Sequence, residues 1–285
     1  MKLIRHGEAG REAPGIVAAD GSLRDLGGRV EDFDSNSIAD GVIERVAAID
    51  PARLPLLDPG TRLGPPVDGV GKVVCVGLNY SDHAEEAGMP IPEEPVVFMK
   101  APSAISGPYD PVLYPPDGSK LDWEVELAFV IGRTARRVSA DRALDHIAGY
   151  LLLNDVSERA FQLELGGQWV KGKSCDSFCP IGPWLVTPDE IPDPNALAIW
   201  LDVNGKRRQD GNTRTMIFDV AYLVSYLSRF MTLLPGDIVT TGTPPGVGLG
   251  VKPEPEFLAI GDEMRLGIEG LGEQCQRVVG DERDS

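Results

Sequence analysis

The sequence of 285 residues is poor in cysteine, histidine and basic residues, and it contains no long hydrophobic run. Two of its four cysteines, Cys175 and Cys179, lie four positions apart, but no matching Cys or His pair completes a zinc site. Free thiols in a reducing compartment are the simpler interpretation. No apolar segment has the length of a membrane span and no secretory signal opens the chain, so we expect a cytoplasmic protein without a membrane partner.

Basic residues are outnumbered, with 27 Lys and Arg against 44 Asp and Glu, and the net charge is −17. Nucleic-acid binding needs a basic surface, so this balance argues against a nucleic-acid partner. It does not exclude an anionic substrate, because a bound metal ion can reverse the sign of one pocket.

Glycine and proline are plentiful, with 33 and 24 residues, and they predict many turns and a β-rich fold rather than a helical bundle. The length suggests one large and one small domain. Residues 1–65 are predicted to form a small N-terminal α+β domain, with strands near 1–5, 15–19 and 22–25 and a helix over 37–50. The Pro- and Gly-rich segment 54–69 resembles a linker, and a larger β-rich domain is expected over 70–280.

Residues 3–8, Leu-Ile-Arg-His-Gly-Glu, match the signature of the histidine phosphatases, in which such a histidine is phosphorylated. That chemistry also requires a second catalytic histidine and further arginines downstream. His83 and His146 are the remaining histidines, and neither follows an apolar strand in the way that this chemistry needs. We therefore interpret His6 as an incidental match.

The segment 123–132, Trp-Glu-Val-Glu-Leu-Ala-Phe-Val-Ile-Gly, reads as a strand that carries two carboxylates. Alternate side chains share a face of a strand, so Glu124 and Glu126 point the same way. If the strand is buried on both faces, the pair needs a cation, because desolvation and mutual repulsion both oppose ionisation. An edge strand with two solvated glutamates is the alternative, and the segment alone does not decide between them.

Further polar residues follow other predicted strands. Asp155 comes directly after the apolar strand 149–154, and Arg159 and Gln162 lie four and seven residues beyond it on one helical face. His83 and Glu86 are three apart on a short helix after the strand 72–77, so they are neighbours there. A carboxylate beside an imidazole raises the basicity of the ring, which suits a general base, although an ordinary surface histidine fits this pair as well.

The glycine-rich run 242–250 is not a dinucleotide-binding fingerprint, because the prolines in the Lys-Pro-Glu-Pro segment 252–255 forbid the helix that such a fingerprint needs. We expect instead a loop whose backbone N–H groups and Thr243 hydroxyl can approach an anion.

Five motifs occur in order along the chain: Val-Gly-Leu-Asn-Tyr-Ser-Asp-His at 76–83, Asp-Trp-Glu-Val-Glu-Leu at 122–127, Asn-Asp-Val-Ser-Glu-Arg at 154–159, Gly-Lys-Ser at 172–174 and Thr-Gly-Thr-Pro-Pro-Gly-Val-Gly at 241–248. Together they resemble the fumarylacetoacetate hydrolase superfamily over about residues 70 to 270. With the N-terminal region included, the chain is similar to bacterial sugar-acid members, especially 2,4-diketo-3-deoxy-L-rhamnonate or L-fuconate hydrolases.

The resemblance implies an α+β, β-rich fold with a mixed β-roll catalytic core, a small N-terminal α+β domain and assembly as a homodimer. It also implies a Mg²⁺ or Mn²⁺ ion held by Glu124, Glu126 and Asp155. Carboxylate oxygens are the ligands that such hard divalent ions prefer.

The activity implied is hydrolysis of a C–C bond in an acylpyruvate, here a 2,4-diketo sugar acid that would give pyruvate and lactate. His83 and Glu86 would lie on a lid and activate water, and Lys173 would lie near the pyruvate enolate. Cys175 departs from the aromatic residue that many relatives have after the Lys-Ser pair, which affects packing there. The resemblance implies that Gln162 and Thr243 hold the 2-oxo acid end of the substrate. Arg159, Lys100 and Ser103 are further candidates for substrate contact.

Four alternatives are compatible with these residues. Oxaloacetate-type decarboxylation and 2-oxo acid tautomerisation also need a stabilised pyruvate enolate but no activated water, so the His83–Glu86 pair favours hydrolysis. Ureidoglycolate lyase activity is a weaker alternative on the same fold. A non-catalytic sugar-acid binder would keep the metal carboxylates but would not need His83, Glu86 and Lys173 together.

Overall fold

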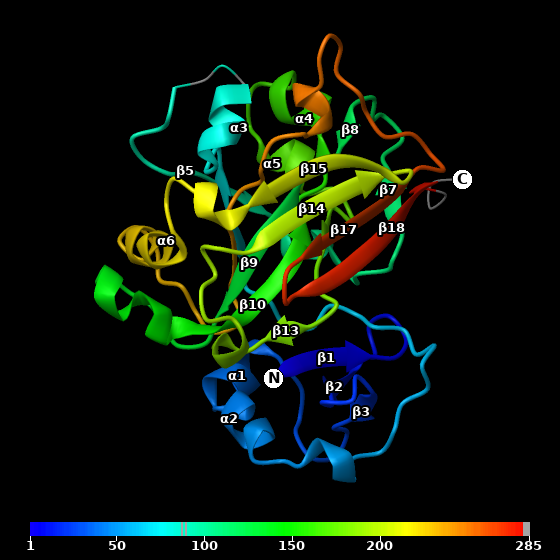
Figure 1. The fold of residues 1–285 in the computed structure, drawn as a ribbon, viewed down its shortest axis with the longest axis vertical. Helices are drawn as coiled ribbons and strands as arrows, with labels where there is room; N and C mark the ends of the chain where they lie inside the picture. The colour runs from blue at the N-terminus through cyan, green and yellow to red at the C-terminus, as the bar shows by residue number, and fades with distance from the viewer. Residues whose placement is uncertain (87, 89, 282–285) are drawn as a thin grey trace.

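The computed structural model describes residues 1–86, 88 and 90–281 and contains two main sheets (Figure 1). The larger one has nine strands, in the spatial order β3 (Leu23–Asp25), β2 (Ala13–Val17), β1 (Lys2–His6), β13 (Leu185–Val186), β10 (Ile147–Asn154), β9 (Val125–Ile131), β16 (Ile238–Thr240), β4 (Val73–Gly77) and β5 (Val96–Lys100). The second has five, in the order β15 (Lys206–Asn212), β14 (Ala198–Val203), β17 (Glu263–Ile268), β18 (Gly272–Gly280) and β7 (Val112–Tyr114).

Shorter elements complete the chain. Two small pairs join β11 (Ser157–Glu158) to β8 (Leu121–Asp122) and β12 (Cys179–Pro180) to β6 (Ile105–Ser106). The α-helices are α1 (Ser35–Ala39), α2 (Val42–Ala47), α3 (Ser81–Glu86), α4 (Arg159–Leu163), α5 (Val170–Lys173) and α6 (Val220–Leu227). Turns of 3₁₀ helix lie at Pro51–Arg53, Pro102–Ala104, Ala140–His146, Pro188–Glu190, Thr213–Thr215 and Gly248–Gly250. This architecture confirms the predicted β-rich α+β class.

The two-glutamate segment lies in the middle of the larger sheet. β9 pairs antiparallel with β10 on one side and with β16 on the other, and every residue of β9 and β10 is buried. A strand that is apolar on both faces needs cover on both faces, which a central position provides. The buried alternative is therefore correct, and the edge strand with solvated glutamates is wrong.

The N-terminal strands continue the larger sheet. β1 pairs antiparallel with β13 through Lys2 opposite Val186 and Leu3 opposite Leu185. The sheet therefore crosses the predicted boundary between residues 1–65 and 70–280, and that division stays a prediction. The segment 54–69 has no long helix or strand, but Leu54, Leu63 and Val67 are buried, so it packs against the protein rather than spanning a gap.

Glycine and proline interrupt two segments of regular structure. The helix over 37–50 divides into α1 and α2 at Gly41, which has a φ of +75°, a conformation that glycine adopts without a steric penalty. The segment 179–186 forms two short strands, β12 and β13, because Pro180 and Pro183 cannot donate to a ladder.

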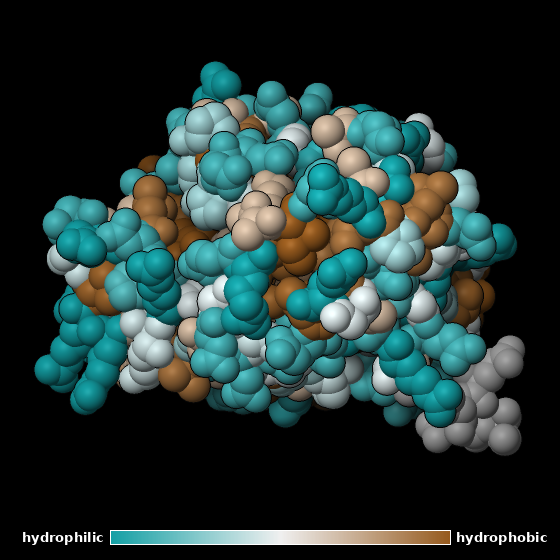
Figure 2. Space-filling model, turned by 90° about the horizontal axis from the view of Figure 1, so that it is seen from below, coloured by the Kyte–Doolittle hydropathy of each residue, from teal (hydrophilic) through white to brown (hydrophobic). Residues whose placement is uncertain are grey.

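Seen from below, the surface is mostly hydrophilic, with separate hydrophobic areas between the hydrophilic side chains (Figure 2). Among the described residues, no helix is both long and apolar enough to cross a membrane. All four cysteines are free thiols, as predicted, and Cys75 and Cys179 are buried.

Candidate metal centre and active site

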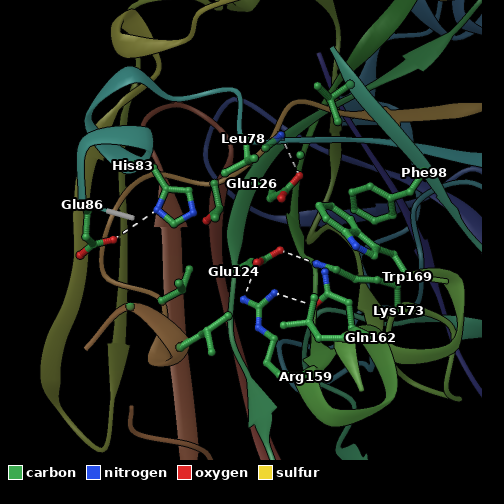
Figure 3. A pocket seen from close by; sticks show the side chains of 18 of the residues that line it. Leu78, His83, Glu86, Phe98, Glu124, Glu126, Arg159, Gln162, Trp169 and Lys173 are labelled. Atoms are coloured by element: carbon green, nitrogen blue, oxygen red, sulfur yellow. Dashed lines mark hydrogen bonds and ion pairs between the residues drawn. The ribbon is translucent and has the colours of Figure 1, made fainter. Parts of the chain in front are cut away.

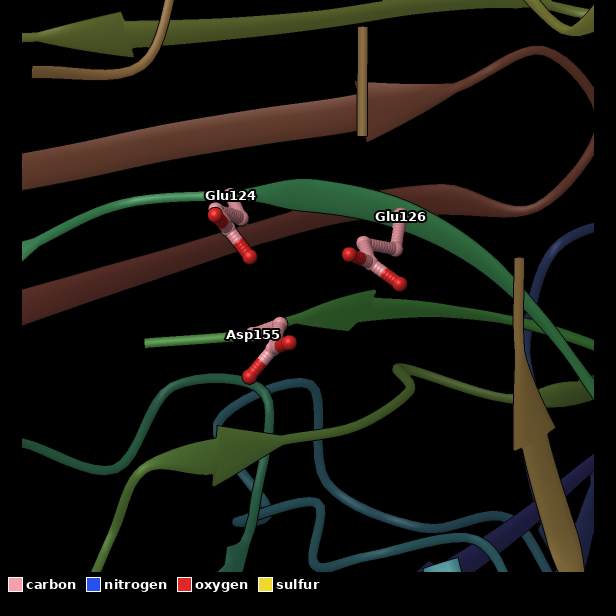
Figure 4. A group of neighbouring side chains, drawn as sticks. All are labelled: Glu124, Glu126 and Asp155. Atoms are coloured by element: carbon pink, nitrogen blue, oxygen red, sulfur yellow. The ribbon is translucent and has the colours of Figure 1, made fainter. Parts of the chain in front are cut away.

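The three predicted metal ligands come together at the ends of the two central strands (Figure 4). Glu124 directly precedes β9, Glu126 lies within it and Asp155 directly follows β10. The strand register places Asn154 opposite Val125, and the Asp155 amide donates to the Glu124 carbonyl at 2.8 Å. One carboxylate oxygen of each residue lies within 4.8 Å of the others, and all three side chains are buried.

Three buried basic side chains surround this triad. The Lys173 Nζ lies 2.6 Å from Glu124 Oε2 and 2.8 Å from Asp155 Oδ2. The Arg159 Nη2 lies 2.5 Å from Glu124 Oε1, and the Lys100 ammonium pairs with Asp155 from the other side. Two of the three carboxylates therefore have direct basic partners.

Glu126 differs from its neighbours. Its Oε2 accepts a hydrogen bond from the Gly242 amide at 3.0 Å, and no described Lys or Arg forms an ion pair with it. Burial, together with the charges of Asp155 and Glu124, raises the pKa of Glu126 well above its usual range. Burial also opposes ionisation of Glu124, but Arg159 and Lys173 outweigh it and lower the pKa of that carboxyl.

The charges of the cluster show whether a metal ion fits. Three buried cations face four buried carboxylates, which are Asp122, Glu124, Glu126 and Asp155. Glu126 is the carboxylate left without a basic partner, and a divalent cation would favour its ionised form; a set of carboxylate oxygens also suits Mg²⁺ or Mn²⁺. The residues present therefore fit the predicted ion.

A cavity of about 400 Å³ opens over Glu124 and Glu126 (Figure 3). Its walls are largely apolar, and the side chains that form them are Val76, Leu78, Phe98, Leu163, Trp169, Val247 and Leu249. Phe98 and Trp169 meet edge to face with ring centroids 5.3 Å apart, and Lys173 Nζ lies 5.1 Å from the Phe98 centroid. The cavity thus combines a charged floor with largely apolar walls.

His83 and Glu86 reach the cavity from α3, on the side opposite Arg159 and Lys173 (Figure 3). The His83 Nδ1 lies 3.2 Å from Glu86 Oε2, and the same oxygen accepts a hydrogen bond from the Gly246 amide at 3.2 Å. Because Nδ1 pairs with Glu86, Nε2 is directed away from this carboxylate. This is the arrangement expected of an oriented general base.

The predicted substrate contacts divide into two groups. Gln162 and Arg159 line the cavity from α4, and Gln162 accepts from Arg159 Nη1 at 3.0 Å. Thr243 also lines it, but its hydroxyl donates to the Val125 carbonyl and accepts from Gln209, so it is not available to an anion as expected.

Lys100 and Ser103 do not line the cavity. Lys100 is fully buried against Asp155 and the Val156 carbonyl, so it supports the triad instead of facing a substrate. Ser103 is exposed on the 3₁₀ turn Pro102–Ala104. Neither residue is therefore placed to contact a substrate in the cavity, although Lys100 belongs to the charged cluster beneath it.

Sequence reasoning missed Asp122, Phe98 and Trp169. Asp122 was detectable, because it stands two residues before Glu124 and so shares the face of the two glutamates. The contact between Phe98 and Trp169 joins residues far apart in the chain, and no local pattern announces it.

Comparison with known proteins places this site in a family. Residues 72–279 match the model of the fumarylacetoacetate (FAA) hydrolase C-terminal domain. A Burkholderia lata protein named as a hydrolase without a substrate is 58% identical over 276 residues, which cover 97% of this chain and 98% of that protein.

Solved structures of similar fold align with 99% of this chain and 100% of their own chains. They include a fumarylacetoacetate hydrolase from Exiguobacterium antarcticum (39% identity, TM-score 0.88) and a maleylpyruvate hydrolase from Sphingobium sp. SYK-6 in complex with manganese(II) and pyruvate (31%, 0.81). A third is a 2-hydroxyhepta-2,4-diene-1,7-dioate isomerase from Mycobacterium marinum (34%, 0.75). With this coverage, the chain belongs to the fumarylacetoacetate hydrolase family.

Proposed function

We propose that the protein is a metal-dependent hydrolase that cleaves the C3–C4 bond of an acylpyruvate and releases pyruvate. The observation that carries this proposal is a buried triad of carboxylates, with excess negative charge, beneath a cavity that His83 and Glu86 enter from the opposite side. The likeness to a maleylpyruvate hydrolase that holds manganese(II) and pyruvate supports it.

Glu124, Glu126 and Asp155 would hold the ion. A divalent ion bound there would supply positive charge that offsets the charge of the pyruvate enolate as the bond breaks. Gln162 and Arg159 lie where they can orient the 2-oxo acid end of the substrate.

His83, oriented by Glu86, would take a proton from water, and the resulting hydroxide would add to the C4 carbonyl. The C3–C4 bond would then break, with its electron pair passing to the pyruvate enolate and the acyl group leaving as a carboxylic acid. Protonation of C3 completes the balance of atoms. Lys173, close to both Glu124 and Asp155, would add positive charge near the enolate.

On the basis of the sequence resemblance, we propose a 2,4-diketo-3-deoxy sugar acid of the L-rhamnonate or L-fuconate type as the substrate. Its cleavage would give pyruvate and lactate. The cavity walls are apolar, and the Thr243 hydroxyl is already paired. These two features favour an acyl group with fewer hydroxyls, so both kinds of substrate belong in the first test. We also propose a homodimer, which light scattering after size-exclusion chromatography would test.

Isomerisation or decarboxylation at the same site is the second candidate, and the likeness to a 2-hydroxyhepta-2,4-diene-1,7-dioate isomerase is the observation in its favour. Neither reaction requires activated water. A hydrogen-bonded His83–Glu86 pair at the cavity favours hydrolysis over both.

The deciding experiment measures pyruvate release from a 2,4-diketo-3-deoxy sugar acid and from alkyl acylpyruvates, with Mg²⁺ or Mn²⁺ and then with EDTA. Pyruvate that forms with metal and stops with EDTA is the expected result. Carbon dioxide from oxaloacetate without pyruvate from any acylpyruvate would establish the decarboxylase instead. The absence of both products would favour a binding protein.

A further inference from the structure

Asp122 is a fully buried carboxylate beside the site that does not line the cavity. It ends β8 and accepts four hydrogen bonds. Its Oδ1 accepts from the amides of Trp123 at 2.8 Å and Gly248 at 2.6 Å. Its Oδ2 accepts from the Leu249 amide at 3.0 Å and from Arg159 Nε at 2.8 Å. A buried carboxylate with this many donors is held in one position.

One side of Asp122 fixes a cavity wall. Two of the amides that it binds, those of Gly248 and Leu249, belong to the 3₁₀ turn Gly248–Gly250, and Leu249 and Gly250 line the cavity. The approach is close, because a Cβ atom at position 248 would lie 2.7 Å from Asp122 Oδ1 and 2.0 Å from the Glu256 carbonyl oxygen. Glycine is therefore required there for the turn to rest on Asp122.

The other side of Asp122 holds Arg159. The three nitrogens of this guanidinium contact three different groups, with Nε on Asp122, Nη2 on Glu124 at 2.5 Å and Nη1 on Gln162 at 3.0 Å. Arg159 therefore lies between one carboxylate that faces the cavity and one that does not. Without the charge of Asp122, its positive charge would be shared with Glu124 alone and would compete with a metal ion for that ligand.

We propose that Asp122 is a positioning residue that sets the metal affinity of the triad and the place of the cavity wall, acting through Arg159 and through the turn Gly248–Gly250. This inference rests on the metal site of the proposed function. In this role Asp122 contacts neither the metal ion nor the substrate.

The test is a titration of the purified protein with Mn²⁺ alone, followed by calorimetry or electron paramagnetic resonance. Asp122→Asn keeps the shape of the side chain but removes its charge, and we expect the dissociation constant for Mn²⁺ to rise about tenfold or more. KM for an acylpyruvate should rise as well, because Gln162 and the turn lose their support. Wild-type Mn²⁺ affinity in a folded Asp122→Asn protein would overturn the inference.

Asp237→Asn is the matched control. Asp237 is also a buried aspartate, and it accepts from the amides of Lys72 at 3.1 Å and Leu234 at 2.6 Å and pairs with the Lys72 ammonium. It does not line the cavity. We expect this variant to lose stability while keeping its Mn²⁺ affinity, so an equal loss of affinity in both variants would reduce Asp122 to a structural role.

Arg159→Lys provides a second route if Asp122→Asn fails to fold. It keeps the positive charge, but a single ammonium cannot reach three partners as the guanidinium does. Mn²⁺ affinity should fall here too, and wild-type affinity in a folded Arg159→Lys protein would by itself overturn the inference. Where Asp122→Asn also folds, adding it to Arg159→Lys should weaken Mn²⁺ binding less than in the wild-type background, because both changes act on one contact. Additive effects would refute action through Arg159. A wild-type protein that binds no Mn²⁺ would refute the metal site itself. Failure of the proposed function can therefore be distinguished from failure of the role proposed for Asp122.

Discussion

The structure contains two clusters of acidic and basic side chains, and they differ in burial. The site cluster consists of Lys100, Asp122, Glu124, Glu126, Asp155, Arg159 and Lys173. The junction cluster joins the N-terminal region to the rest of the chain and consists of Arg5, Glu12, Asp32, Arg62, Asp68 and Asp110. Each cluster has more carboxylates than cations.

Burial decides what the excess negative charge means. In the junction cluster the Asp68 side chain is 60% exposed and those of Arg62 and Asp110 are partly exposed, so water and salt can screen the charge. In the site cluster every side chain is buried, and the Glu126 side chain has no basic partner among the described residues. A metal site is thus marked by carboxylates that water cannot reach. The excess of acidic over basic residues alone would choose the junction cluster, where four carboxylates face two arginines.

Removing the charge of Glu126 is the sharpest way to test this comparison. Glu126→Gln keeps an acceptor for the Gly242 amide but removes a metal ligand, so turnover should fall on the order of 100-fold or more. The melting temperature of the metal-free protein should rise by about 2–4 °C, because folding no longer has to bury or protonate an unpaired carboxylate. Activity assays and thermal melts in EDTA measure both. A variant that is inactive and also less stable without metal would contradict the charge argument.

The second prediction separates water activation from binding. His83→Ala should lower kcat by about 10²–10⁴-fold, because general-base catalysis is lost. Mn²⁺ and pyruvate should still bind with wild-type affinity, since the triad and Gln162 do not contact this side chain through any hydrogen bond or ion pair in the described structure. Steady-state kinetics and calorimetry give the two readouts. Full activity in His83→Ala would show that another group activates water or that the reaction needs none.

The sequence allowed the class of fold and the shared face of the two glutamates to be predicted, because both follow from short-range periodicity. It could not decide whether their strand was buried, since that depends on β10 and β16, which come from later parts of the chain. The prediction that the Thr243 hydroxyl would be free to bind an anion failed for a similar reason, because it depends on distant residues. Its hydroxyl is occupied by Val125 and Gln209, and neither contact leaves a local pattern.

The third prediction turns to the junction cluster. Arg62 binds Asp110 through two nitrogens, at 2.9 and 2.6 Å, and Glu12 at 2.8 Å. Arg62→Met would leave the buried Glu12 with the more distant Arg5 at 3.9 Å, so the free energy of unfolding should fall by about 1–3 kcal/mol. Because no member of the junction cluster lines the active-site cavity, kcat should be unchanged at a temperature where the variant is folded. Urea unfolding tests the loss of stability, and steady-state kinetics test the unchanged kcat. A loss of kcat in the folded variant would show that the junction cluster influences the active site.

The smallest effect is expected from Asp68→Asn, which is the counterpart of Glu126→Gln in the exposed cluster. Asp68 accepts from Arg5 Nη2 at 3.1 Å, but its exposure to water makes this ion pair weak. The free energy of unfolding should change by less than about 0.5 kcal/mol, and neither Mn²⁺ affinity nor turnover should move. Urea unfolding of the two variants side by side measures the difference. If Asp68→Asn stabilised the protein as much as Glu126→Gln does, repulsion among carboxylates would be equally strong with and without water, and burial would no longer distinguish the metal site.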